Sequence, residues 1–396
     1  MKAVSGLDVH KDTIFACILQ KGNPSFIREY STLTCGIEAL RDDLIAMGVK
    51  TVALESTGIY WIPVWKILEE YFELILVNPY YIKQVPGRKT DVKDAQWIAT
   101  LLQKGLLKGS FVPGHLLREL REYERGYVRL SGHETRLEQT IERQLIKCNI
   151  RITSFATQIG SATVMKIVKA ICEGETVAGE LEKLVHGRIR NKHKEKVYQS
   201  LQGAIRPSDK LLLNQGYVQY QLIKQQQSEL IEHMTRICRD HFEKEMETLC
   251  TIPGVNVLSS MMIIAEIGVN MNSFPTDKHL VSWAGLRPRN DESAGKIKSK
   301  KITHGNKYLR RVLVQCAWAA SRTKGSWFQG KFQQLCVRKS EKKALIAIAR
   351  KQLMIIYHLL QTKMSYIAPI QVITEKQKER KIKYLQKQLE ELLNMG

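Results

Sequence analysis

Two acidic residues lie in predicted β-strands near the start of the chain, where a carboxylate is costly unless a cation balances it. The stretch Lys2–Leu19 has two apolar runs joined by a polar turn, a pattern that predicts a β-hairpin. Asp8 is in the middle of its first strand, and period-2 alternation places Asp8 and His10 on one face of that strand. The partner of Asp8 is then either a Lys or Arg side chain or a metal ion. Glu55 ends the predicted strand Thr51–Glu55, and α/β sheets hold functional groups at such ends.

A second pair of acids, Asp91 and Asp94, lies three residues apart in a helix predicted to run from Thr90, its N-cap, to about Leu102. The two like charges share one helix face and repel each other. Divalent cations would relieve this repulsion. Mg²⁺, with Mn²⁺ as the alternative, takes hard oxygen ligands, and two such ions about 3.5–4 Å apart clamp the reacting oxygens of a phosphodiester. The structural alternative is that the helix dipole stabilises acids in the first turn.

The third candidate for chemistry is Ser293, which lies among small residues in the basic stretch Trp283–Arg311. A serine becomes a nucleophile only when a base or cations stabilise its alkoxide, and Lys and Arg beside a phosphate stabilise the charge that develops in transfer. On residue types alone, an exposed phosphate-binding loop with an uninvolved serine is the simpler explanation. Ser282 and Ser299 are weaker candidates nearby. The side chains expected to bind nucleic acid are Arg287, Arg289, Lys296, Lys298, Lys300, Lys301, Lys307, Arg310 and Arg311.

The composition points to a polyanionic partner. Among 396 residues, 61 are Lys or Arg and 39 are Asp or Glu, a net charge of +22 that favours nucleic acid. The sequence holds no apolar run of about 18 residues, so no membrane partner is expected, and it shows no signal-peptide pattern. The eight cysteines are scattered without a Cys-x-x-Cys pair, which is typical of reduced cytosolic thiols.

The elements that position these residues change in character along the chain. Strands in a meander, followed by strands that alternate with helices, predict a mixed α/β domain over residues 1–112. Over residues 113–248, the apolar side chains of Leu116–Ile141 and Tyr220–Ile237 follow a 4-3 spacing. This spacing is typical of long helices that pair as an antiparallel hairpin or across a dimer. The intervening basic patch His186–Lys194 is either a solvated face or a nucleic-acid contact.

The last part of the chain is predicted to be mostly helical. Residues 249–370 begin with the turn Pro253-Gly254-Val255 before an apolar helix. This pattern is similar to a helix-hairpin-helix, in which backbone N–H groups meet a phosphate. Asn256 stands where a second Gly is common. Residues 371–396 alternate charged and polar side chains, which predicts an exposed terminal helix.

Seven blocks along the chain resemble the DEDD transposases of the insertion-sequence 110 family. They are Gly6–His10, Leu54–Tyr60, Lys89–Ala95, Pro253–Val255, Ala284–Pro288, Glu292–Lys296 and Gly305–Arg310. The resemblance implies an N-terminal domain with the RNase H-like fold of the RuvC resolvase, whose D, E, D and D are Asp8, Glu55, Asp91 and Asp94. It also implies that Ser293 is the nucleophile of a C-terminal transposase domain. A structured noncoding bridge RNA, which pairs with donor and target DNA, is a further implied partner.

These observations together predict a bacterial, cytoplasmic recombinase that moves its own insertion element and associates with the nucleoid when active. It would cut and rejoin DNA through a phosphoserine, with Mg²⁺ at the four acids. The apolar stripes of Leu116–Ile141 and Tyr220–Ile237, together with the need to cut several strands in concert, predict a homodimer or homotetramer. Two alternatives remain open: a metal-dependent, RuvC-like junction nuclease that uses water, and a nonenzymatic nucleic-acid-binding protein.

Overall fold

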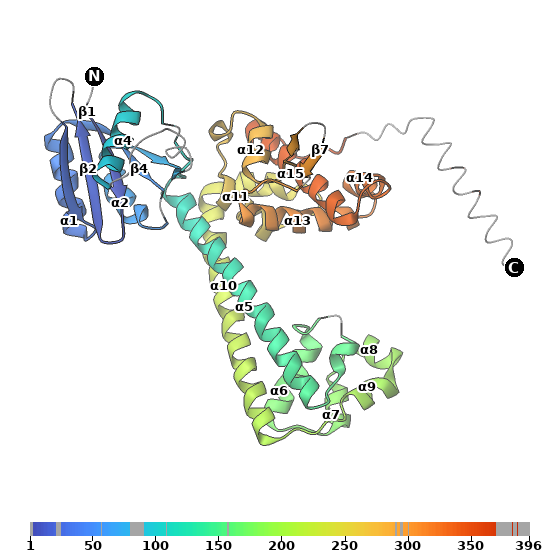
Figure 1. Ribbon diagram of the computed structural model, residues 1–396. Helices are drawn as coiled ribbons and strands as arrows, with labels where there is room; N and C mark the ends of the chain where they lie inside the picture. Colours follow the sequence, from blue (N-terminus) through green and yellow to red (C-terminus); the bar gives the residue numbers. More distant parts are fainter. Residues whose placement is uncertain are drawn as a thin grey trace. The chain divides into compact units, whose positions relative to one another are not determined.

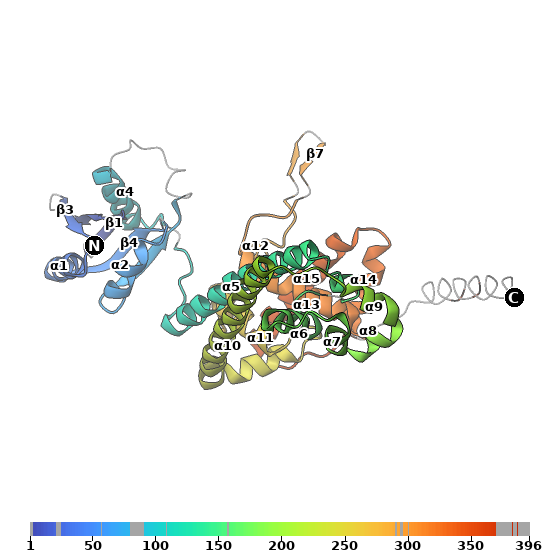
Figure 2. The same ribbon diagram turned by 90° about the horizontal axis from the view of Figure 1, so that it is seen from below.

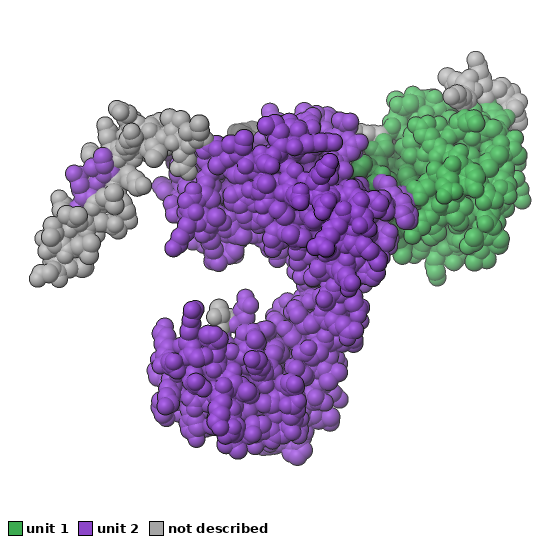
Figure 3. All heavy atoms as spheres, turned by 180° about the vertical axis from the view of Figure 1, so that it is seen from behind, with its two compact units in different colours: residues 1–113 green, residues 114–396 purple. Residues whose placement is uncertain are grey.

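The computed structural model describes residues 3–20, 25–56, 58–79, 91–107, 109–156, 158–289, 291–293, 296–299, 301–369, 382 and 386 (Figure 1). The chain forms two compact units, residues 1–113 and 114–396 (Figure 3). Thr90, Lys300 and almost all of the terminal helix predicted for residues 371–396 lie outside the described residues.

The first unit is built on a five-stranded mixed sheet in the order β3-β2-β1-β4-β5. Its strands are β1 (Ala3–Val9), β2 (Thr13–Leu19), β3 (Phe26–Ser31), β4 (Val49–Glu55) and β5 (Glu73–Val77). The first three form an antiparallel meander, which includes the predicted hairpin, while β4 is parallel to β1 and β5 is parallel to β4. The prediction of a mixed α/β sheet domain in this part of the chain is therefore confirmed.

Helices cover both faces of this sheet. Figure 2 shows α1 (Thr34–Ala46) and α2 (Trp61–Leu68) on one side and α4 (Asp91–Gln103) on the other. Alternation along β1 divides its side chains between these two layers. Leu7 and Val9 belong to the larger core with α1 and α2, whereas Gly6 lies against α4.

The second unit contains two long helices, α5 (His115–Lys147) and α10 (Pro207–Cys250), which pack against each other within the chain (Figures 1 and 2). Polar contacts fix their antiparallel register. Gln144 donates to Asp209 (2.8 Å) near one end, and Gln227 donates to Glu134 (2.7 Å) further along. The two apolar stripes predicted from the sequence thus form an intramolecular hairpin, the first of the two alternatives.

A lobe of short helices connects α5 to α10. It comprises the 3-10 helix η1 (Ile152–Ser154), α6 (Ala162–Glu173), α7 (Ala178–Lys183), α8 (Gly187–Lys192) and α9 (Lys194–Ser200). Its apolar core includes Ile141 of α5, Ile167 of α6 and Leu213 of α10. The basic patch of residues 186–194 spans α8 and the start of α9.

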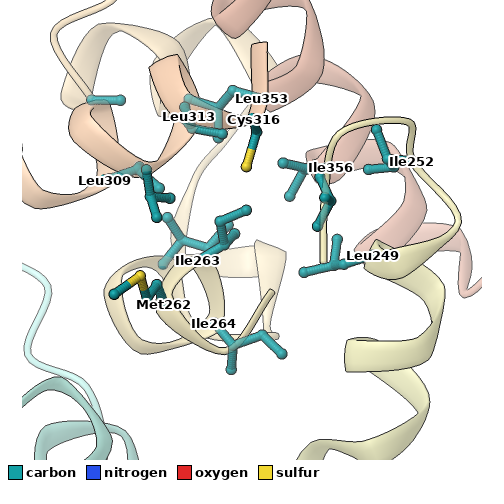
Figure 4. Close-up of a cluster of buried hydrophobic side chains, with 14 of the residues drawn as sticks. Leu249, Ile252, Met262, Ile263, Ile264, Leu309, Leu313, Cys316, Leu353 and Ile356 are labelled. Carbon is teal, nitrogen blue, oxygen red and sulfur yellow. The ribbon is translucent and has the colours of Figure 1, made fainter. Parts of the chain in front are cut away.

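The remaining elements pack around the other end of the long helices. They are α11 (Val257–Ile267), η2 (Met271–Ser273), α12 (Asp277–Trp283), β6 (Asp291–Ser293), β7 (Lys296–Ser299), α13 (Lys307–Arg322), α14 (Trp327–Cys336) and α15 (Glu341–Thr362). Figure 4 shows side chains such as Ile263, Leu313 and Ile356 converging from α11, α13 and α15. Among the described residues, no helix is long and apolar enough to cross a membrane.

Candidate functional sites

Two of the predicted acids lie side by side on the face of the sheet that α4 covers. Gly6 and Ala53 are register partners in β1 and β4. A Cβ on Gly6 would be only 2.3 Å from the backbone nitrogen of Ala99, so glycine allows α4 to lie directly on the sheet. Because side chains alternate along strands, Asp8 and Glu55, two residues further on, point to this same face at the carboxyl ends of their strands.

Asp8 is a buried carboxylate, with only 7% of its surface exposed. The Nε2 atom of His10 lies 3.2 Å from its Oδ2 atom. Glu55 is half-buried. Asp8 and His10 thus lie together at the end of β1. Their position on one face agrees with the alternation predicted for this strand.

The other two predicted acids come from α4. Asp91 is its first residue, and its side chain is outside the described part of the structure. Asp94 is half-buried and directly precedes Ala95, whose carbonyl oxygen lies over Gly6. The structure therefore carries Asp94 to the face of the sheet that also holds Asp8 and Glu55.

The chemistry of these four carboxylates suits Mg²⁺, because Mg²⁺ binds to carboxylate oxygens in proteins. Among the described side chains, however, no group of three or more His, Cys, Asp or Glu lies close enough to hold a metal ion. The four acids thus stay a predicted metal site. Its geometry depends on Asp91, whose side chain is not described.

Ser293 lies in a two-stranded arm of the second unit, which the sequence had indicated only as a basic stretch rich in small residues. In the antiparallel pair β6–β7, Ser293 is the register partner of Lys296, and Figure 2 shows β7 standing out from the neighbouring helices. The side chains of both residues are outside the described part of the structure. The alternation Lys296-Ile297-Lys298-Ser299 was the sequence signal that could have indicated a strand here.

The root of this arm continues the antiparallel pairing. The backbone nitrogen of Arg289 donates to the carbonyl of Lys301 (3.0 Å), and that of Thr303 donates to Arg287 (2.9 Å). The side chains of Arg287, Arg289 and Lys301 are exposed, as a nucleic-acid contact requires.

Two glycines meet where the arm joins the helices. Gly285 adopts φ +71°, in the left-handed region that favours glycine. A Cβ on Gly305 would lie 2.3 Å from the backbone nitrogen of Gly285. Only glycine at both positions allows the two ends of the arm to approach this closely.

Asn306 links the arm to a buried acid that sequence reasoning missed. Its Oδ1 atom accepts from the backbone nitrogens of Tyr308 and Leu309 (both 3.0 Å), which caps the N-terminus of α13. Its Nδ2 atom donates to the carboxylate of Glu266. Glu266 is fully buried at the end of α11, and an acid in the apolar run Met261–Ile267 was the only sequence signal.

Two arginines of α5 neutralise this carboxylate. Arg125 forms a forked pair with Glu266, with Nε–Oε1 at 2.9 Å and Nη2–Oε2 at 3.2 Å. Arg121 donates to the carbonyls of Ala265 (3.0 Å) and Glu266 (2.7 Å), which have no further helix partner at the end of α11. These bonds tie α11, and through Asn306 the start of α13, to the long hairpin.

A second buried acid, Glu124, lies beside Glu266 with only 1% of its surface exposed. Burial raises the pKa of Glu124 to about 8, and the neighbouring charge and hydrogen bond of Glu266 contribute in the same direction. Glu124 is therefore mostly a neutral carboxylic acid at neutral pH.

The other predicted basic contacts lie at the start of α13. Lys307 and Arg311 are exposed and Arg310 is half-buried. The Nζ atom of Lys307 lies 5.1 Å from the ring centre of Tyr308. Lys298 belongs to β7, without a described side chain. All nine basic residues stay predicted nucleic-acid contacts.

The turn before α11 accounts for Asn256, the departure noted in the sequence. Gly254 has φ +86°, and its missing Cβ would lie 2.3 Å from the carbonyl oxygen of Cys316, so the turn packs on α13. Asn256 caps α11, since its Oδ1 atom accepts from the backbone nitrogen of Ser259 (2.8 Å). A second glycine would lose this cap.

Curated relatives match parts of the chain. An IS110 insertion-element protein of Streptomyces coelicolor is 28% identical over 114 residues, 28% of each protein. A pilin gene-inverting protein of Moraxella bovis is 32% identical over 127 residues, 31% of this chain and 39% of that protein. The transposase of insertion sequence IS1328 from Yersinia enterocolitica is 32% identical over 92 residues, 22% of this chain and 27% of that protein. The matched regions thus span well under half the length of these relatives.

Two family models match the two halves of the chain. A model of DEDD-type IS110 transposases matches residues 5–150, which include all four predicted acids. A model described as the transposase IS116/IS110/IS902 family matches residues 246–333, which include Ser293 and the arm. Because both models describe one family and together match more than half of the chain, this protein belongs to the IS110 family of transposases.

Proposed function

We propose that this protein is a DNA transposase and site-specific recombinase that cuts and rejoins DNA through a serine–DNA intermediate. The observation that carries the proposal is the placement of Asp8 and Glu55 side by side on neighbouring parallel strands, on the face that α4 and its Asp94 cover. The strand order β3-β2-β1-β4-β5, with its antiparallel meander, supports an RNase H-like, RuvC-like fold for this unit. The name of the pilin gene-inverting relative supports a DNA rearrangement.

The proposed chemistry at Ser293 is a transesterification. The Oγ atom attacks the phosphorus of a DNA phosphodiester and loses its proton. A serine–phosphate bond forms while the bond to one neighbouring deoxyribose oxygen breaks, and that oxygen takes up a proton. Because one phosphoester replaces another, the intermediate retains the energy for rejoining. Lys and Arg of the arm and of α13 would stabilise the added negative charge.

Asp8, Glu55, Asp91 and Asp94 would hold Mg²⁺, or Mn²⁺ in its place, through carboxylate oxygens. Such an ion stabilises negative charge on the phosphodiester oxygens and on the leaving group. The burial of Asp8 supports this role, because a buried carboxylate requires a compensating positive charge.

The proposed partners are donor and target DNA and a structured bridge RNA, supported by the net charge of +22. A homodimer or homotetramer is supported by Leu211, Val218 and Leu222, three exposed apolar side chains at i, i+7 and i+11 of α10. The domain boundaries predicted at residues 112, 248 and 370 belong to this proposal, as does action in the bacterial cytoplasm, at the nucleoid.

The test uses a suicide substrate, which is a nicked end of the cognate insertion element, together with the bridge RNA. Wild-type protein should form a DNA adduct that survives denaturation and maps to Glu292–Lys296. Ser293→Ala, which removes one oxygen, should bind the substrate normally and cut nothing, while Ser282→Ala and Ser299→Ala serve as matched controls. Cutting by Ser293→Ala without an adduct would establish the water-using nuclease instead. If the wild type and all three variants bind the substrate but none cuts it, the nonenzymatic alternative would be favoured.

A further inference from the structure

A cavity of about 220 Å³ lies between α5, the start of α11 and α13. Its floor is apolar and buried, with Met262, Val312 and Cys316 among its lining residues. Its rim is polar and exposed, and includes the Arg311 guanidinium and the Gln315 amide. An apolar interior with a few polar groups is the usual composition of a small-ligand site.

The cavity contains one buried polar group whose hydrogen bonding is incomplete. Glu124 lines it, and among the described residues the Oε2 atom of Glu124 has no hydrogen-bond partner. Leaving such an atom unpaired in the interior is costly. The raised pKa of Glu124 means that this group is mostly a neutral carboxylic acid, which both donates and accepts hydrogen bonds.

The charges around the cavity suit a ligand with two parts, a neutral ring in the interior and a phosphate at the rim. Arg121 and Arg125 are already engaged by Glu266 and the end of α11. The guanidinium of Arg125 also lies 4.6 Å from the ring centre of Tyr308, which fixes this wall of the cavity. Tyr127 provides a second aromatic lining residue. At the rim, the guanidinium of Arg311 lies 3.5 Å from the carbonyl oxygen of Val128, and among the described residues no acid forms an ion pair with Arg311.

We propose that this cavity receives one unpaired nucleobase of a bound nucleic acid, with Glu124 hydrogen-bonded to the base edge and Arg311 beside the phosphate. About 220 Å³ has room for a single base but not for a base pair. Enzymes that extrude a base read it in this way, through hydrogen bonds to its edge and contact with aromatic and apolar side chains. The inference rests on the proposed function only in requiring that the protein bind nucleic acid.

The experiment compares short thymidine and uridine oligomers with an abasic oligomer of the same length and charge. Affinities are measured at one salt concentration, because the phosphate contribution is salt-dependent. Wild-type protein should bind one base-containing oligomer roughly 5- to 100-fold more tightly than the abasic one, the range that one bound base supplies. The preferred sugar shows whether the base comes from DNA or RNA.

Ala319→Phe places a ring in the cavity and should bring this ratio close to one without changing the affinity for the abasic oligomer. Thr135→Phe adds the same ring on an exposed position of α5 outside the cavity and should keep the wild-type ratio. Glu124→Gln, a neutral donor and acceptor, should also keep it, whereas Glu124→Leu should lower it. Melting temperatures identify a variant that fails to fold.

Photo-crosslinking with 4-thiothymidine or 4-thiouridine provides a second readout that needs no variant. Crosslinks should map to Tyr127–Ser131 of α5 or Arg311–Ala319 of α13. Crosslinks elsewhere, with an unchanged ratio in Ala319→Phe, would mean that the cavity holds solvent only and would overturn the proposal. A protein that binds none of the oligomers would instead contradict the proposed function itself.

Discussion

Buried carboxyl groups recur in both units, and their surroundings give them different properties. Asp8 lies next to an imidazole at the open end of a strand. Glu266 is held by Arg125 and Asn306 in a closed network. Among the described residues, no hydrogen-bond partner contacts the Oε2 atom of Glu124. The first is therefore suited to bind a cation, the second to hold elements together, and the third to carry a proton.

The raised pKa of Glu124 predicts a pH-dependent stability. The folded protein keeps the proton up to about pH 8, whereas an unfolded chain loses it near the ordinary value of 4.5. Folding therefore binds a proton between these values, and the contribution of this group falls as pH rises through that window, by an amount on the order of a few kcal/mol. Glu124→Gln should flatten the decline, as measured by denaturant unfolding at several pH values. An identical slope in the variant would show that Glu124 ionises normally.

The predicted metal ligands give a sharper test at the same scale. Asp8→Asn and Glu55→Gln preserve size but remove charge, so strand cleavage should fall by roughly 100-fold or more. Binding should remain, because it depends on the separate Lys and Arg side chains. Glu29→Gln, an exposed acid on β3, is the matched control. Full cleavage by both variants in Mg²⁺ would rule out the metal site.

At the scale of elements, the close contact of Gly285 and Gly305 determines the direction in which the β6–β7 arm extends from the helices. Gly305→Ala would place a Cβ within 2.3 Å of backbone. Because the backbone must move, we expect a loss of about 1–3 kcal/mol of stability, together with slower adduct formation. Thermal unfolding and adduct yield on the suicide substrate measure the two effects.

Gly132 on α5 provides the control for that substitution. A Cβ there meets no atom of the described residues within 4 Å, so Gly132→Ala should stabilise the helix slightly. Equal effects of the two substitutions would show that the backbone at the base of the arm can shift to admit a Cβ. The contact of the two glycines would then be unimportant.

At the scale of the whole molecule, the long hairpin has one apolar stripe used internally and a second that remains exposed. Tyr220 and Ile223 are buried within the unit, while Leu211, Val218 and Leu222 are exposed. Val218→Asp should therefore convert a dimer to monomers in light scattering without lowering the melting temperature. Gln221→Asp, an exposed neighbour, should leave the dimer intact. A monomeric wild-type nucleoprotein complex would contradict the proposed assembly.

The sequence by itself determined the local elements and the positions of the candidate residues. Alternation of apolar residues predicted β1 and β2 and placed Asp8 on one face of a strand. The 4-3 spacing predicted α5 and α10, because both periodicities follow directly from backbone geometry. The basic stretch around Ser293 was visible as composition. The hairpin within it was missed because its strands are short.

Tertiary structure alone decided which of these elements meet. Arg125, Glu266 and Asn306 are far apart in the chain, and no local pattern relates an acid in one helix to an arginine in another. The same holds for Gly6 beneath Ala99 and for Gly285 against Gly305, where a missing side chain has meaning only once its neighbour is known. Pairing of α5 with α10 rather than with a second copy was equally open, since an apolar stripe specifies burial but not the partner that provides it.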